Sequence, residues 1–361
     1  MTNNISNETP RRGGRINYID ALRGLSMILV VLAHVFLLMS PRHWDGSPVA
    51  SVLMSFRMPL FFFVSGFFAY KAIDKWTQTI VTDILIRKIR AQVLCATLFY
   101  ILYQLVNNCP PFFFLEDGYG YFWFTIALFQ MFVLYVVLNL LSRLLRVNLV
   151  DGGLAVLAVL SCIFGLTVIN FRTGIVLSWH QILTYLPFFA VGILSRRHWD
   201  TFQAILRRDW FRTLMIVLFV AGCFMFYNGR YHQPSDTGTY LLQGILHRFS
   251  GMFSVLIFFH TRADYFDGNH AVARFLRYTG QRTLDIYMMH MFFMPHLYQT
   301  GWFNSLLAPN MVVYKLAVTV PTALAIVCLC LLCSSLLRSS HFLAVWLFGV
   351  RNKPAARPAK A

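Results

Sequence analysis

About ten long apolar runs follow one another along this 361-residue chain, separated by short polar segments. A helix needs roughly 20 apolar residues to cross a hydrocarbon core about 30 Å thick, and most of these runs approach that length. The runs are continuous and lack the alternation of a membrane β-strand, which favours helices over a barrel. We therefore expect an all-α, polytopic membrane protein with about ten transmembrane helices in one bundle. The expected spans are residues 19–39, 50–70, 85–106, 121–141, 153–171, 180–195, 213–228, 240–260, 283–299 and 312–337.

Composition supports a membrane protein and leaves little room for a separate globular domain. The chain is 58% hydrophobic and only 12% charged, whereas soluble domains carry about 25% charged residues. The polar first 14 residues do not resemble a secretory signal, so we expect a first helix that is retained. The expected organisation is a cytoplasmic tail at 1–18, a transmembrane domain at 19–338, and a cytoplasmic amphipathic segment with a basic tail at 339–361.

The net charge of +17 predicts the orientation in the membrane. If the N-terminus is cytoplasmic and the side alternates at each span, most of the Lys and Arg residues lie in cytoplasmic segments, as the positive-inside rule requires. Both termini are then cytoplasmic. Anionic lipid is the expected partner of this charge, and nucleic acid is not, because the cations are spread over several short segments. The sequence gives no prediction of oligomeric state. The outer connections keep only Arg42, Arg172, Arg230 and Lys315.

Seven cysteines do not indicate a disulfide framework or a metal site. Six of them fall inside apolar runs, and only Cys109 lies in a polar connection. Cys328, Cys330 and Cys333 are close in sequence, but no His or carboxylate accompanies them. We expect small core residues and no metal.

Ionisable residues inside a bilayer are rare and costly, so each of them is a candidate site residue. Arg23 and His34 are 11 residues apart on the first expected helix, a rotation only about 20° beyond three full turns. They therefore share a face and lie about 16 Å apart along the axis. This pair predicts a cation near the inner mouth aligned with a deep imidazole. The alternative is that Arg23 reaches lipid phosphate while His34 is a hydrogen-bonded core residue.

Other buried ionisable residues lie on the second, eighth and ninth spans. Arg57 precedes a Met-Pro pair and a triple Phe, and we favour a buried functional role for it over an outer-leaflet anchor. His290 is either a second catalytic group or a helix-packing residue, and Asp285 is expected to pair with an arginine. His247 and Arg248 are adjacent, so at most one of them points inward.

Two motifs resemble acyltransferase family 3. Residues 18–24 (YIDALRG) followed by 30–34 (VVLAH) resemble the first-helix signature of that family, an arginine, ten intervening residues and a histidine. Residues 56–67 (FRMPLFFFVSGF) are similar to its second-helix motif. Looser similarities are Trp123-Phe124, Pro187-Phe188-Phe189 with Gly192, and residues 280–290. The second-helix motif is most similar to that of the fucose 4-O-acetylase-like, carbohydrate-modifying branch.

The resemblance implies an enzyme of the bacterial inner membrane that moves an acyl group, most simply acetyl from acetyl-CoA, to a carbohydrate hydroxyl. It implies donor-binding and catalytic roles for Arg23 and His34, a catalytic or substrate-binding role for Arg57, and a less specific catalytic match at His290. Further candidate substrate-binding residues are Trp123 and Arg248. The alternative is a transporter of an anionic solute or a glycan intermediate, although no internal repeat typical of transporters is visible.

Overall fold

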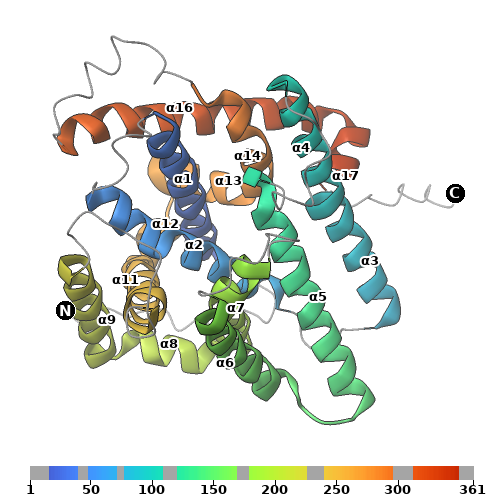
Figure 1. Cartoon of the computed structure of the whole chain (residues 1–361), viewed down its shortest axis with the longest axis vertical. Helices are drawn as coiled ribbons and strands as arrows, with labels where there is room; N and C mark the ends of the chain where they lie inside the picture. The colour runs from blue at the N-terminus through green and yellow to red at the C-terminus, as the bar shows by residue number, and fades with distance from the viewer. Residues whose placement is uncertain are drawn as a thin grey trace, which may run out of the picture.

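The computed structural model describes residues 16–39, 48–70, 77–108, 120–168, 179–225, 240–295 and 312–348, and no strand occurs among them. The expected all-α class is confirmed for this part of the chain (Figure 1). The first half comprises α1 (Asn17–Met39), α2 (Pro48–Ala69), α3 (Gln78–Lys88), the π-helix η2 (Ile89–Leu94), α4 (Cys95–Val106), the 3₁₀ turn η4 (Gly120–Phe122), α5 (Trp123–Leu144) and α6 (Val150–Val168). The second half comprises α7 (Trp179–Arg197), α8 (Trp199–Arg207), α9 (Asp209–Met225), the π-helix η6 (Tyr240–His247), α11 (Arg248–Thr261), α12 (Ala263–Asp267), α13 (Ala271–Gln281), α14 (Thr283–Met289), the 3₁₀ turn η7 (His290–Phe293), α16 (Val312–Ser339) and α17 (His341–Phe348).

Helix α1 lies at the centre of the bundle, where it packs against α2, α11, α13, α14 and α16. Its contact with α13 is close because two glycines face each other. A Cβ on Gly24 would overlap the carbonyl oxygen of Leu276, and a Cβ on Gly280 would overlap that of Asp20. Small residues allow two backbones to approach in this way, as is common between membrane helices.

A second glycine pair sets the contact between α2 and α7. A Cβ on Gly66 would overlap the Phe189 carbonyl oxygen, and a Cβ on Gly192 would overlap that of Phe63. These two crossings are the most extensive helix contacts in the described structure. Together they hold α1 and α2, which carry the polar residues singled out above, against their neighbours.

Helices occur at most of the expected spans, but fewer of them are long enough to cross a bilayer alone. Five helical segments meet the length and hydropathy for a membrane span within the described residues, and two apolar helices, Ser55–Ala69 and Val150–Gly165, are shorter. The structure therefore supports a membrane protein with five candidate spans. The long segments are Asn17–Leu37, Gln78–Val106, Gly120–Leu144, Leu241–Thr261 and Leu316–Ser339.

The expected ninth span at 283–299 differs most from the prediction. In the described part of this segment, α14 ends at Met289 and a 3₁₀ turn of four residues follows. The apolar run therefore does not form one long helix, because residues after Met289 leave the α-helical geometry and place His290 at the break. The end of the run, from residue 296, lies outside the described residues, as does Cys109.

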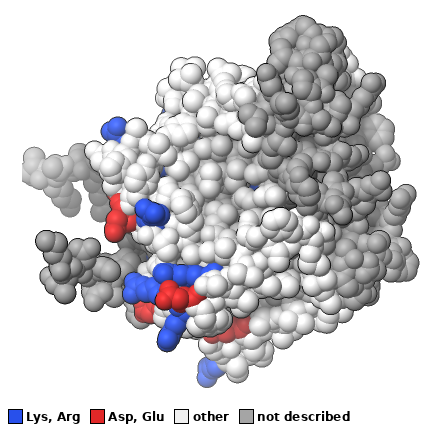
Figure 2. All heavy atoms as spheres, turned by 90° about the vertical axis from the view of Figure 1, so that its left-hand side faces the viewer, with Lys and Arg blue, Asp and Glu red and all other residues white. Residues whose placement is uncertain are grey.

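The exposed surface has the character of a protein in lipid. Figure 2 shows a largely uncharged face on which the visible Lys, Arg, Asp and Glu side chains gather toward one part. On α9, Val217 and Phe224 are 56% and 78% exposed, and on α16 Leu332 is 62% exposed. Soluble proteins rarely expose large contiguous apolar areas, so these helices are suited to contact hydrocarbon.

Helix α17 packs against η2 and α4. It buries Ala344, Val345 and Phe348 and leaves Phe342 and Trp346 exposed. The Arg90 guanidinium lies over the Trp346 ring, 4.8 Å from its centroid. Helix α17 thus supports η2, the π-helical segment that joins α3 to α4.

Candidate active site

Two histidines from distant parts of the chain meet inside the bundle. His34 on α1 and His290 after α14 have ring centroids 5.0 Å apart, and His290 Nε2 lies 3.3 Å from His34 Nδ1. His290 is fully buried. The sequence left open whether His290 is functional or a packing residue, and the structure places it beside the other candidate. The two residues therefore form one histidine pair.

Backbone carbonyls determine how the pair shares its protons. His290 Nδ1 lies 2.8 Å from the Tyr287 carbonyl oxygen and 3.2 Å from that of Ile286. A carbonyl only accepts hydrogen bonds, so His290 Nδ1 carries the hydrogen. In a neutral ring Nε2 is then an acceptor, and His34 Nδ1–H donates to it. This arrangement leaves Nε2 of His34 without a proton and able to act as a base.

Tyr287 fixes the position of the pair against the start of α5. Its hydroxyl donates to the Tyr121 carbonyl oxygen at 2.7 Å and accepts from the Phe124 amide at 3.1 Å. The Tyr121 ring is edge-on to His34, with centroids 5.9 Å apart. Since Tyr287 lies one turn before His290, the break after α14 and the beginning of α5 are held together around the two imidazoles.

A cavity of about 290 Å³ lies between α1, α2, α3, η2, α5 and α14, and neither His34 nor His290 is among its lining residues. Three cations line it, namely Arg23, Arg87 and Lys88. Phe61 and Tyr287 also line it, and the Tyr287 ring centroid lies 5.7 Å from that of His290. Tyr287 thus links the wall of this cationic cavity to His290. The volume of the cavity lies at the lower end of ligand pockets, roughly 300 Å³ and above.

The structure places the two members of the predicted pair on α1 in different surroundings. Arg23 lies in the cavity, with its guanidinium 5.4 Å from the Phe68 ring centroid, whereas His34 meets His290. Because α1 is one continuous helix, the two side chains are about 16 Å apart along its axis. Arg57 on α2 is buried and lies within electrostatic range of His34, so it belongs with the histidines rather than with Arg23.

Trp123 and Arg248 both meet Tyr185 on α7. The Trp123 and Tyr185 rings are stacked with centroids 5.9 Å apart, and Phe62 stacks on Tyr185 at 4.9 Å. The Arg248 guanidinium lies 5.8 Å from the Tyr185 ring centroid. The two candidate substrate-binding residues thus share an aromatic cluster, which consists of Phe62, Trp123 and Tyr185.

The aromatic cluster is next to the cavity but separated from it by phenylalanines. Phe124 lines the cavity, and its ring contacts both Phe61 and Phe62 at 4.7 and 4.8 Å. Phe62 in turn stacks on Tyr185. His247, the neighbour of Arg248, turns elsewhere and stacks on Phe219 at 5.3 Å. The two adjacent side chains thus contact different aromatic rings, and the expectation that at most one of them points inward toward the site stays a prediction.

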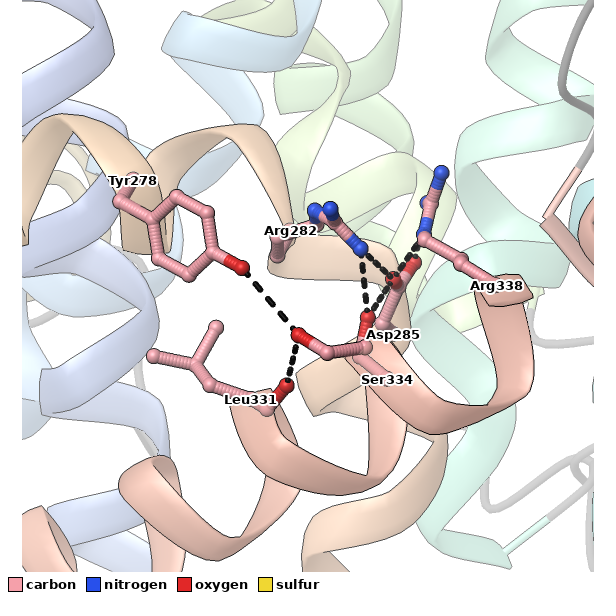
Figure 3. Close-up of polar contacts among 7 residues, drawn as sticks. Tyr278, Arg282, Asp285, Leu331, Ser334 and Arg338 are labelled. Carbon is pink, nitrogen blue, oxygen red and sulfur yellow. Dashed lines mark hydrogen bonds and ion pairs between the residues drawn. The ribbon is translucent and has the colours of Figure 1, made fainter.

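Asp285 pairs with arginine, as the sequence predicts. The fully buried carboxylate accepts from Arg338 Nε at 2.7 Å and from a second Arg338 nitrogen at 2.9 Å, and it also contacts Ser334 and Arg282 (Figure 3). Arg282 donates to the Ser334 hydroxyl at 2.9 Å. This network ties α14 to α16 and so supports the segment that carries His290.

Replacing Asp285 with alanine is expected to lower the thermal midpoint of unfolding in detergent by several degrees. Breaking a buried ion pair costs about 3–5 kcal/mol, and partial exposure of the arginines reduces that figure. The matched control is Asp209→Ala, whose carboxylate is 93% exposed beside Arg212 and whose loss is expected to shift the midpoint little. Equal midpoints for the two variants would contradict a structural role for the network.

Sequence reasoning missed several residues of the site. Tyr287 and Tyr185 were missed because tyrosines in apolar runs are typical of membrane interfaces. The positive-inside rule accounts for Arg87 and Lys88 as cytoplasmic charge, although their position at the start of a span is also compatible with a cationic rim. No group of three His, Cys, Asp or Glu residues is placed to hold a metal in the part of the chain that the structure describes.

An all-helical protein with candidate membrane spans and a buried histidine pair beside a cationic cavity has the features of an integral-membrane transferase. The family model described as an acyltransferase domain, that of acyltransferase family 3, matches residues 16–338. The chain therefore belongs to this family and is a membrane acyltransferase, as the first two motifs indicate. No curated protein and no solved structure matches the chain.

Proposed function

We propose that this protein transfers an acyl group, most simply acetyl, from acyl-CoA to a hydroxyl of a carbohydrate. One observation carries the proposal. The cavity that Arg23, Arg87 and Lys88 line has Tyr287 in its wall, one turn before His290, whose Nε2 lies 3.3 Å from His34 Nδ1. Acyl transfer from acyl-CoA needs a site that holds the phosphates of CoA and a general base that takes the proton of the acceptor hydroxyl.

Acetyl-CoA is the proposed donor. Its phosphates would lie against the guanidinium and ammonium groups of the cavity, which suit phosphate oxygens. Its thiol arm would extend along the cavity toward Tyr287, so that the thioester comes within reach of His34. This assigns donor binding to Arg23 at the cavity and to His34 at the thioester.

The proposed reaction needs only one base. His34 Nε2 takes the proton of the acceptor hydroxyl as the oxygen bonds to the thioester carbonyl carbon. The carbon–sulfur bond then breaks, the proton passes to the leaving thiolate, and the products are an ester and free CoA. His290 accepts from His34 Nδ1–H and orients the ring as it becomes charged, as the buried acid does in a catalytic triad. Arg57 stabilises the oxyanion or holds the acceptor.

A carbohydrate is the proposed acceptor, and the aromatic cluster is the proposed place where it approaches. Trp123 and Arg248 meet at Tyr185, and aromatic rings with a nearby cation suit a sugar that carries polar groups. We propose that the protein belongs to the fucose 4-O-acetylase-like branch of the family, on the basis of the Arg57-Met58-Pro59 sequence and the triple Phe that follows it.

The proposed setting is the inner membrane of a bacterium, with about ten membrane passes and both termini in the cytoplasm. The distribution of Lys and Arg supports this orientation. It places the cavity, with Arg87 and Lys88 near the start of the third pass, on the cytoplasmic side where acyl-CoA is available. The aromatic cluster, near the starts of α5 and α7, is then closer to the outer side.

The proposal is tested with purified protein in liposomes that are supplied with a glycan extract and with acetyl-CoA labelled in its acetyl group. We expect label to move from CoA to glycan, and we expect Arg23→Ala to raise the KM for acetyl-CoA at least tenfold, because a charge-assisted phosphate contact is lost. Solute flux without consumption of donor would instead identify a transporter. Comparing surface glycans of strains with and without the protein by mass spectrometry then identifies the acceptor.

A further inference from the structure

Two polar side chains in the wall of the cavity are buried without a hydrogen-bond partner among the described residues. They are the side-chain oxygen of Gln92 and the hydroxyl of Thr283, and both residues line the cavity. Gln92 is 8% exposed and Thr283 is 1% exposed. A buried polar group without a partner costs about 1–3 kcal/mol, so two of them in one cavity indicate a ligand that supplies the missing partners.

The local structure explains why these side chains face the cavity. Gln92 lies in the π-helical segment η2, which interrupts the α-helical register between α3 and α4. Such segments often occur at functional sites because they redirect side chains. Thr283 is the first residue of α14, which also contributes to the wall of the cavity. The two groups thus face the same space from elements that are far apart in the sequence.

The chemistry of the two groups differs from that of the cations nearby. The Gln92 oxygen only accepts hydrogen bonds, and an ionised phosphate has no hydrogen to give it. The ligand must therefore present an N–H or O–H group to Gln92 while it presents negative charge to Arg87 and Lys88. Gln92 lies four residues beyond Lys88, about 6 Å along the helical axis, so the two parts of the ligand lie one after the other.

We propose that Gln92 and Thr283 bind the amide and hydroxyl groups of a phosphopantetheine arm, and that they set the depth at which its thioester stops. This inference rests on the proposed function and adds the residues that recognise the uncharged part of the donor. A cavity of about 290 Å³ is small for a whole CoA molecule. It suits the arm, with the nucleotide at the cationic rim.

Binding measurements with two ligands test the inference. Isothermal titration on the detergent-solubilised full chain compares CoA with adenosine 3′,5′-bisphosphate, which has the phosphates but no arm. Gln92→Leu and Thr283→Val are each expected to weaken CoA binding roughly fivefold, the loss of about one hydrogen bond. Neither is expected to change the affinity for the bisphosphate. If Gln92→Leu does not fold, Gln92→Met keeps the length of the side chain and takes its place.

Two control variants on α3, the helix that continues into η2, accompany these variants. Gln78→Leu and Thr82→Val remove the same groups at exposed positions of α3, and both are expected to bind the two ligands as the parent does. Equal weakening of both ligands in Gln92→Leu would show a structural role and overturn the inference. Unchanged CoA binding in Gln92→Leu and Thr283→Val would also overturn the inference, but acetyl-CoA would remain the proposed donor. A parent protein that binds neither ligand would reject the donor and the proposed function with it.

Discussion

Replacing His34 with alanine is expected to lower kcat for acyl transfer by about 10²–10⁴-fold, the usual contribution of a positioned general base. The variant loses the Nε2 atom that takes the acceptor proton, while the cavity and its cations stay in place. The phosphate contacts of the donor are retained and only the contact at the thioester is lost, so we expect the affinity for acetyl-CoA to fall far less than kcat. Initial rates with labelled donor, measured at saturating donor concentration, separate these two effects.

His270→Ala is the matched control for this experiment. His270 is exposed, stacks on Tyr265 and is not among the residues that line the cavity, so its loss is expected to leave kcat unchanged. His290→Ala is expected to lower kcat less than His34→Ala does, because it removes the partner that orients the ring rather than the base. Full activity in His34→Ala would reject the proposed mechanism.

Gly192→Ala is expected to prevent normal assembly of the bundle or to lower its thermal midpoint by several degrees. The added Cβ would overlap the backbone oxygen of Phe63, and a backbone cannot move aside as a flexible side chain can. Overpacking of this kind typically costs about 1–3 kcal/mol, occasionally more. Because α2 carries Arg57, activity is expected to fall together with stability.

Gly152→Ala provides the comparison, since a Cβ at that position meets nothing within 4 Å. Alanine is also the better helix former by about 1 kcal/mol, so this variant is expected to match or exceed the parent in thermal stability. Fluorescence-detected unfolding in detergent measures both. Equal midpoints for Gly192→Ala and Gly152→Ala would show that the close crossing of α2 and α7 does not limit stability.

The sequence predicts those parts of the fold and site that depend on local periodicity. Helical runs, the single α1 helix with Arg23 and His34 on one face, and the pairing of Asp285 with an arginine all follow from spacing or from the cost of buried charge. The family follows from residues 18–34 and 56–67. Each of these predictions uses residues within one helix, or a rule that holds wherever the partner lies.

Tertiary packing decides the rest. Hydropathy alone could not show that the ninth run breaks at His290, because Met291, Phe292 and Phe293 are as apolar as the helix before them. The contact between His34 and His290 joins residues 256 positions apart, and no alternation or spacing encodes it. In the sequence Gln92 is an isolated polar residue in an apolar run, and its place in the cavity wall, on the π-helix η2, is visible only in the structure.

The most direct test of the account is an electron cryomicroscopy map of the protein with a non-hydrolysable acetyl-CoA analogue. We expect the phosphates beside Arg87 and Lys88, the arm beside Gln92, and the acyl carbonyl carbon adjacent to His34 Nε2. An analogue bound outside this cavity, or one whose acyl group points away from the two imidazoles, would contradict the account.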